Sequence, residues 1–384
     1  MKRNAKLVVT ILLIATLCAA SLLTLSGCSI LILASRIGNK SAEIVVNGAH
    51  IWVVPSNDNA VLMYFDADTT LEKGELQTCE VPESVSYRRK EYPVTQIGYN
   101  SYGQTAIING DAQIGELVVP SSVTYINLDY FSDIDTLEAI TVSGGNSNYY
   151  SKDGVLYKIN GDYSSRSYLD LEYYPLGKKD ATVELPRAFR SILYNSHIWE
   201  NENLQNLEIE YGGNFTSING ALYSKDGETL MLYPVHNTNS AFVAPKGMKN
   251  IDLQSCFWEN DNVKIVEVEE DSQYLKVEDN VLYSKDGSEL IFRPNDGREY
   301  FAIPSTVRVV SYNALMGLQY LYVPKEVVVF LDVFTCSNFS LSQISHVYFE
   351  SETLPKYLRD VEFTEQQIRF GYTRERFDEL INNL

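Results

Sequence analysis

The feature that most constrains the fold of this 384-residue chain is an internal repeat. Its clearest mark is an apolar residue followed by proline, and these prolines are separated by 66, 59 and 59 residues. An apolar residue returns six positions after each proline. The prolines are Pro120, Pro186, Pro245 and Pro304, and the returning residues are Ile126, Ile192, Ile251 and Val310. Signals that keep phase over four copies predict one stacked repeat array in place of several ordinary domains.

A motif that ends in Leu-Tyr is the second mark of the repeat, and it occurs at 154–157, 220–223 and 280–283. Asp-Gly pairs next to these motifs predict β-hairpins, because Asp-Gly readily supplies the positive φ angles of a tight turn. We therefore expect three matching Asp-Gly turns, and their aspartates are Asp153, Asp226 and Asp286. Near-alternating apolar residues predict further strands at 137–142, 204–209 and 263–268.

The stretch 119–126, Val-Pro-Ser-Ser-Val-Thr-Tyr-Ile, together with the residues that follow it, resembles the BspA-type leucine-rich repeat. The segment 92–98 resembles the opening of such arrays, and Asp-Gly-Val-Leu-Tyr hairpins recur in this family. The resemblance covers about residues 81–349 and implies a mainly β fold, a leucine-rich-repeat solenoid with inserted β-hairpins. The chain departs from the family pattern in two ways. The Ala-Phe pair of the family is replaced by Tyr130-Phe131, His197-Ile198 and Cys256-Phe257. The last step of the repeat, from Pro304 to Pro324, shortens to 20 residues.

The repeat array is expected to span residues 81–350, with other segments on either side. Residues 1–27 read as a lipoprotein signal peptide, 28–45 as a tether, and 46–80 as a β-rich N-terminal cap. Residues 351–384 read as a C-terminal cap with a short helix, because 364–367 matches a capping box and 373–384 has helical spacing. Caps of this kind cover the open ends of a repeat stack.

The N-terminus predicts the compartment. Three basic residues precede an apolar run over 7–25, which is the layout of a secretory signal. The run ends in Leu-Ser-Gly-Cys at 25–28, which resembles the lipobox of bacterial lipoproteins. The resemblance implies that Cys28 carries a lipid that anchors the protein to the bacterial cell membrane, outside the cytoplasm. An uncleaved transmembrane helix over 7–34 is the alternative, and it places the body on the same side.

Charge and motif content argue against several functions. The net charge is −19, and removal of the basic leader leaves 28 basic against 50 acidic residues, so no nucleic-acid partner is expected. No catalytic, metal-binding or cofactor-binding residues are expected, because the four histidines match no zinc or catalytic spacing. Asp66-Ala67-Asp68 lacks the later Gly and Glu of a calcium loop. Outside the leader, Cys79, Cys256 and Cys336 can supply at most one disulfide.

The aromatic residues offer candidate binding positions, since the chain has 27 Tyr, 15 Phe and 3 Trp. Trp199 and Trp258 lie 59 residues apart at equivalent places in the repeat. Two interpretations stay open at this point. The two rings either pack between coils or form part of an exposed aromatic platform, in which case Trp199 and Trp258 are the candidate binding residues.

These features predict a non-enzymatic cell-surface lipoprotein that binds an extracellular protein or glycan through its repeat surface, as an adhesin does. The binding role is implied by the resemblance and is an analogy at the level of the fold. A structural or scaffolding role in the envelope is the main rival. An extracellular hydrolase on a repeat scaffold is a third class, but no pattern of catalytic residues supports it.

Overall fold

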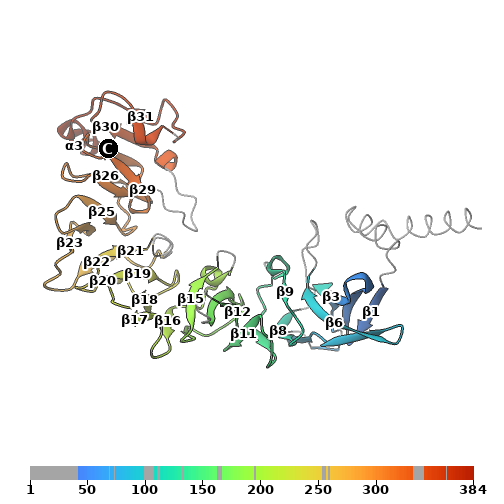
Figure 1. Cartoon of the computed structure of the whole chain (residues 1–384). Helices are drawn as coiled ribbons and strands as arrows, with labels where there is room; N and C mark the ends of the chain where they lie inside the picture. The colour runs from blue at the N-terminus through green and yellow to red at the C-terminus, as the bar shows by residue number, and fades with distance from the viewer. Residues whose placement is uncertain are drawn as a thin grey trace, which may run out of the picture. The chain divides into compact units, whose positions relative to one another are not determined.

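The computed structural model describes residues 42–384, except for 69, 73, 99–107, 110–112, 132–133, 162–166, 194–195, 253–256, 258–259, 332–340 and 360. The predicted signal peptide, Cys28, most of the tether and Trp258 therefore lie outside the described residues, as do Cys256 and Cys336. The chain divides into two compact units, and Figure 1 labels the strands along them. Unit 1 comprises residues 1–178 and 191–197, and unit 2 comprises residues 179–190 and 198–384.

Unit 1 opens with three antiparallel strands, β1 (Ala42–Val46), β2 (Ala49–Val54) and β3 (Asn59–Asp66). Their β-branched residues favour the extended backbone, and alternate side chains such as Ile51 and Val53 are buried. A two-residue turn with positive φ at Asn47 and Gly48 joins the first pair, which suits the twist of a hairpin. β1 occupies the end of the range predicted as a tether.

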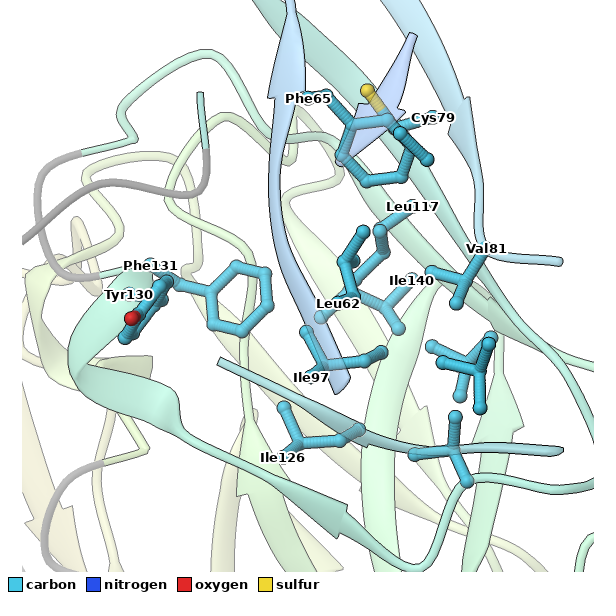
Figure 2. Close-up of a cluster of buried hydrophobic side chains, with 14 of the residues drawn as sticks. Leu62, Phe65, Cys79, Val81, Ile97, Leu117, Ile126, Tyr130, Phe131 and Ile140 are labelled. Atoms are coloured by element: carbon cyan, nitrogen blue, oxygen red, sulfur yellow. The ribbon is translucent and has the colours of Figure 1, made fainter. Parts of the chain in front are cut away.

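Two parallel ladders follow in unit 1, one on each side of the Pro120 turn. The front ladder consists of β4 (Gln77–Glu80), β8 (Ile114–Val119) and β10 (Ala139–Val142). The back ladder consists of β3, β6 (Lys90–Ile97) and β9 (Tyr125–Ile126). Figure 2 shows the core between them, where side chains from both ladders meet; among the residues it labels are Leu62, Ile97, Leu117, Ile126, Tyr130 and Ile140. Burial raises the pKa of the core thiol Cys79 to about 12, so it is an unreactive apolar side chain.

Unit 2 repeats this pattern of parallel pairs. Its front ladder contains β14 (Thr182–Leu185) with β16 (Asn206–Ile209), β20 (Ala241–Ala244) with β22 (Ile265–Val268), and then β26 (Tyr300–Ala302), β28 (Tyr320–Val323), β30 (His346–Phe349) and β31 (Ile368–Arg369). Its back ladder contains β21 (Asn250–Ile251), β27 (Val309–Ser311) and β29 (Val329–Leu331). β21 pairs in parallel with residues 229–230, β27 with residues 289–290, and β29 with β27. The three strands predicted from alternation are confirmed as β10, β16 and β22, each starting two residues later than predicted.

The predicted β-hairpins are confirmed as three antiparallel insertions. They are β11 (Tyr149–Lys152), β12 (Val155–Gly161) and β13 (Ser167–Tyr173); β17 (Phe215–Ile218), β18 (Ala221–Ser224) and β19 (Thr229–Leu232); and β23 (Leu275–Glu278), β24 (Val281–Ser284) and β25 (Glu289–Phe292). Each insertion ends on the strand that joins the back ladder. The strand β15 (Phe189–Ile192) lies at the boundary between the two units.

The predicted set of matching Asp-Gly turns is wrong in one member. Asp153 lies in the first turn of its hairpin, where its counterparts are Asn219 and Asp279, whereas Asp226 and Asp286 lie in second turns. In the first turns two successive residues have positive φ; the angles are 51° and 78° at 153–154, 51° and 78° at 219–220, and 50° and 58° at 279–280. In the second turns only the glycine does, and the aspartate accepts a hydrogen bond from the serine two residues earlier. Asp-Gly therefore serves two different turns here, which composition alone cannot distinguish.

Buried and half-buried asparagines satisfy backbone groups within and between coils. The side-chain oxygens of Asn146, Asn201 and Asn260 each accept the backbone N–H of the residue three positions later. The Nδ2 of Asn260 also donates to the carbonyls of Pro234 and Asn237, at 3.1 and 2.9 Å. Buried polar backbone groups are costly when unpaired, so these amides stabilise the turns that the ladders leave unsatisfied.

The short helix predicted at the C-terminus is confirmed as α3 (Arg374–Ile381). Thr373 caps it by accepting the N–H of Arg376, and Phe377 is its buried residue. No helix follows the predicted capping box, where residues 365–367 form a turn. The backbone N–H of Thr364 does donate to the side-chain oxygen of Gln367. The side-chain amide of Gln367 donates to two carbonyls of the preceding coil, so the chain forms a turn here and not a helix. The 3-10 helices are η1 (Pro55–Asn57), η2 (Leu128–Tyr130), η3 (Ile198–Glu200), η5 (Tyr312–Leu315), η6 (Leu341–Gln343) and η7 (Lys356–Leu358).

Candidate binding surface

The front ladder of unit 2 presents a row of aromatic rings on its outer face. Phe301 of β26, Leu321 of β28 and Val347 of β30 point into the core. Successive side chains of a strand alternate between its two faces. The residues before them therefore point outward, and the strand register places them side by side. We call this set the aromatic row; it consists of Tyr300, Tyr320 and His346.

The rings of the aromatic row follow the strand spacing. The centroids of Tyr320 and His346 are 4.9 Å apart with an interplanar angle of 8°, a stacked pair at the separation of neighbouring strands. Tyr300 lies on β26, at the end of this sheet, and is 49% exposed, while Tyr320 and His346 are half-buried. The Nδ1 of His346 is buried and has no hydrogen-bond partner within the described part of the chain. Stacked rings of this kind offer solvent their edges and polar atoms.

The helix α3 covers the second outward-facing row of the same sheet. Figure 1 shows α3 close to β30 near the C-terminus. The ring of Phe377 lies 5.7 Å from that of Tyr322 and 5.5 Å from that of Tyr348, and all three are buried. Burial raises the pKa of Tyr322 to about 12, and the nearby Glu350 carboxylate adds to the shift. On this sheet the helix thus covers Tyr322 and Tyr348 and leaves the aromatic row uncovered.

This arrangement is suited to binding. Tyrosine supplies a large apolar contact area and a polar tip at a small cost in side-chain entropy, which is why it is frequent in recognition surfaces. Over the residues that the structure describes, no group of three or more His, Cys, Asp or Glu side chains could hold a metal ion. The described helices include none that is long and apolar enough to cross a membrane.

The structure describes only one of the residues predicted from the sequence as candidate sites. Trp199 is half-buried in η3, while Trp258 and the lipidation candidate Cys28 lie outside the described residues. A binding role for Trp199 and Trp258 therefore stays a prediction. Sequence reasoning missed the aromatic row. A signal was present, since Tyr300 and Tyr320 each stand four residues before a proline of the repeat.

Parallel strands that recur on both sides of a phased proline turn define a leucine-rich-repeat solenoid, which is mainly β. The chain has this fold, and the predicted resemblance to BspA-type repeats is confirmed at the level of the fold. No protein-family model matches the chain, and no curated protein matches it.

Several solved structures match over most of the chain at low identity. A leucine-rich cell surface protein from Faecalibacterium prausnitzii is 12% identical with a TM-score of 0.36, and the match covers 89% of this chain and 98% of that one. A leucine-rich repeat protein from Eubacterium ventriosum is 16% identical with a TM-score of 0.38, covering 87% and 96%. One from Bacteroides ovatus is 14% identical with a TM-score of 0.35, covering 80% and 70%.

Proposed function

We propose that this chain is a non-enzymatic binding protein of the bacterial cell surface that recognises an extracellular protein through the front ladder of unit 2. The aromatic row is the observation that carries the proposal. Its three rings are held in register by three parallel strands, so a partner meets a preorganised surface. A rigid surface loses little conformational entropy on binding, which favours affinity.

A protein partner fits this surface better than a glycan does. Sugars stack on open ring faces, whereas Tyr320 and His346 use their faces against each other. Their exposed edges present hydroxyl and imidazole groups beside apolar carbon, which suits a polypeptide with mixed polar and apolar groups. Adhesion to another cell or to host tissue is the biological form that we propose for this activity.

We also propose that the protein is held at the membrane by a lipid on Cys28. The support is the sequence of residues 25–28 after a basic and apolar leader. The strongly acidic body would be repelled by anionic headgroups, so attachment at the N-terminus is the arrangement compatible with its charge.

The binding proposal is tested with the full chain and two probes, a random-peptide display library and a glycan array. We expect the wild-type chain to enrich a set of peptides. The double variant Tyr300→Ala/Tyr320→Ala should bind them about 30-fold more weakly, since loss of a hot-spot tyrosine costs about 2 kcal/mol. Tyr211→Ala is the matched control, because that ring is 100% exposed and lies away from the row.

Two results would count against the proposal. If the double variant and Tyr211→Ala bind the selected peptides equally well, the aromatic row is not the binding surface. If only the glycan array gives ligands, the partner class is wrong. A chain that enriches neither probe is better described as a scaffold of the envelope.

A further inference from the structure

A hollow of about 460 Å³ opens on the front ladder of unit 2, between β16 and β20. The first hairpin turn of the middle repeat forms one wall, through Asn219 and Gly220. Asn239 and the exposed side of β20, including Val243, form another, and the buried tyrosines Tyr223 and Tyr233 also line it. None of the residues that line the hollow is basic.

The two sister turns each have a basic side chain at this place. In unit 1 the ammonium group of Lys178 donates to the backbone carbonyl of Asp153 at 2.6 Å. In the third repeat the guanidinium group of Arg298 donates to the backbone carbonyl of Asp279 at 3.0 Å and to its carboxylate at 2.8 Å. In both turns, the carbonyl oxygen of the left-handed residue thus accepts a hydrogen bond from a positively charged side chain.

The middle turn has the same backbone and lacks the basic residue. Asn219 has a φ of 51°, compared with 51° at Asp153 and 50° at Asp279, so the three residues share the same left-handed region of the backbone. The repeat places Asn237 where Lys178 stands and Asn239 where Arg298 stands. Both asparagines are short and neutral. Asn237 turns instead to the carbonyl of Gln205, to which its amide donates at 2.8 Å.

We propose that this hollow receives a lysine or arginine side chain from a partner protein. The inference rests on the proposed binding function and names the chemistry that the partner must carry. The carbonyl of Asn219 and the side-chain amide of Asn239 supply oxygen acceptors of the kind that Lys178 and Arg298 meet in the sister turns. A chain with 50 acidic and 31 basic residues also attracts a basic partner by its overall field.

Apolar side chains at the rim of the hollow suit the methylene groups of a lysine or arginine side chain. Val243 is 37% exposed, and Ile265 is 47% exposed on the strand paired with β20. Long basic side chains lay their methylene stems on apolar surface while the charged end reaches a polar group. A partner residue can therefore cover these two aliphatic side chains while its cation enters the hollow.

The test uses the full chain with capped pentapeptides that carry lysine, arginine or norleucine at the central position, and with spermidine. We expect the lysine and arginine peptides to bind at least tenfold more tightly than the norleucine peptide. Asn239→Arg copies Arg298 and should fill the hollow from within. It should lower the affinity for both basic peptides at least tenfold and raise Tm, because the turn carbonyl gains a partner.

Gln273→Arg is the control, since it makes the same change in charge at an exposed position outside the hollow. A second filling variant, Asn237→Lys, copies Lys178 and keeps the test valid if Asn239→Arg folds poorly. Equal binding of lysine and norleucine peptides would overturn the proposal, as would an equal loss of affinity in Asn239→Arg and Gln273→Arg.

Spermidine separates the possible sources of the cation. Tighter binding of spermidine than of the basic peptides, lost in Asn239→Arg, would show that a free polyamine and not a partner side chain occupies the hollow. The proposed function fails separately. It fails if the tyrosine double variant keeps its display-selected ligands, whereas this inference fails if filling the hollow leaves the preference for basic peptides unchanged.

Discussion

At the residue scale, side-chain amides link one coil to the next where the strands cannot. The amide of Asn260 reaches two carbonyls of the preceding coil, while its oxygen accepts two backbone N–H groups of its own. A single buried side chain thus satisfies four backbone groups. Such positions are not visible as a period of apolar residues, so sequence patterning does not single them out.

Replacement of Asn260 should therefore destabilise unit 2. We expect Asn260→Ala to lower the free energy of unfolding by about 2–3 kcal/mol, because buried carbonyl and amide groups lose their partners. Asn262→Ala is the control, since Asn262 is exposed and its side-chain amide donates to the carbonyl of Asn237. Urea unfolding of the two variants would measure the difference, and equal midpoints would contradict the assigned role.

His50 provides a pH-dependent contact in unit 1. Its ring nitrogens lie 2.7 Å from Glu43 and 2.9 Å from Asp66, and the ring stacks on Tyr64 at 4.2 Å. Burial lowers the pKa of His50, but the hydrogen bonds and charges of the two carboxylates outweigh it and raise this pKa above 6.5. The charged imidazole therefore stabilises the sheet that joins β1, β2 and β3.

The sign of the pH effect follows from the raised pKa. The stabilisation is fully present below pH 6.5 and is lost as the pH rises through the higher pKa of the folded state. We expect His50→Gln to destabilise the chain more at pH 5.5 than at pH 8.5. Urea unfolding at both values gives the comparison, and a penalty that does not depend on pH would exclude the charged contact.

At the element scale, the strands that alternate were predictable and the shortest ones were not. β10, β16 and β22 each bury their second residue and half-bury their fourth, an alternation that the sequence reveals. β9 and β21 have only two residues each, too few to show a period. Their place was indicated solely by the apolar residue that returns six positions after proline.

The aromatic row was not predictable for a related reason. A tyrosine that ends up outward in a strand looks the same in the sequence as one that is buried. Tyr320 and Tyr322 stand two residues apart on β28 and share a face, yet only Tyr322 is buried. The difference comes from α3, more than 50 residues later, whose Phe377 ring packs on the ring of Tyr322.

The docking of α3 makes a prediction of its own. Phe377 is buried against Tyr322 and Tyr348, so Phe377→Ala should cost about 3–5 kcal/mol of packing energy and release the helix. Hydrogen exchange should then speed up in α3 and over β28 and β30, while β16 and β20 keep their protection. Leu384→Ala is the control, since that residue is 75% exposed. Uniform loss of protection through unit 2 would contradict a local role.

At the scale of the whole molecule, the proposed attachment to the membrane would depend on a single residue. A lipid on Cys28 would hold a chain whose body carries a large negative charge. We expect Cys28→Ser to remove incorporation of a palmitate analogue in growing cells and to change the electrophoretic mobility of the product. Cys79→Ser is the control, because that thiol is buried and unreactive. Labelling that persists in Cys28→Ser would rule out the lipid anchor.

The regular step of the repeat has an evolutionary consequence. Pro186, Pro245 and Pro304 stand at the same point of successive copies, 59 residues apart. Recombination between two copies at this point would add or remove one whole repeat. Each strand at the new junction would still lie beside a strand with which it can pair. Recombination at non-equivalent points of two copies would shift the repeat and disrupt its buried apolar layers. Descendants of such a chain can therefore vary their length in fixed increments, while selection on surface side chains proceeds independently.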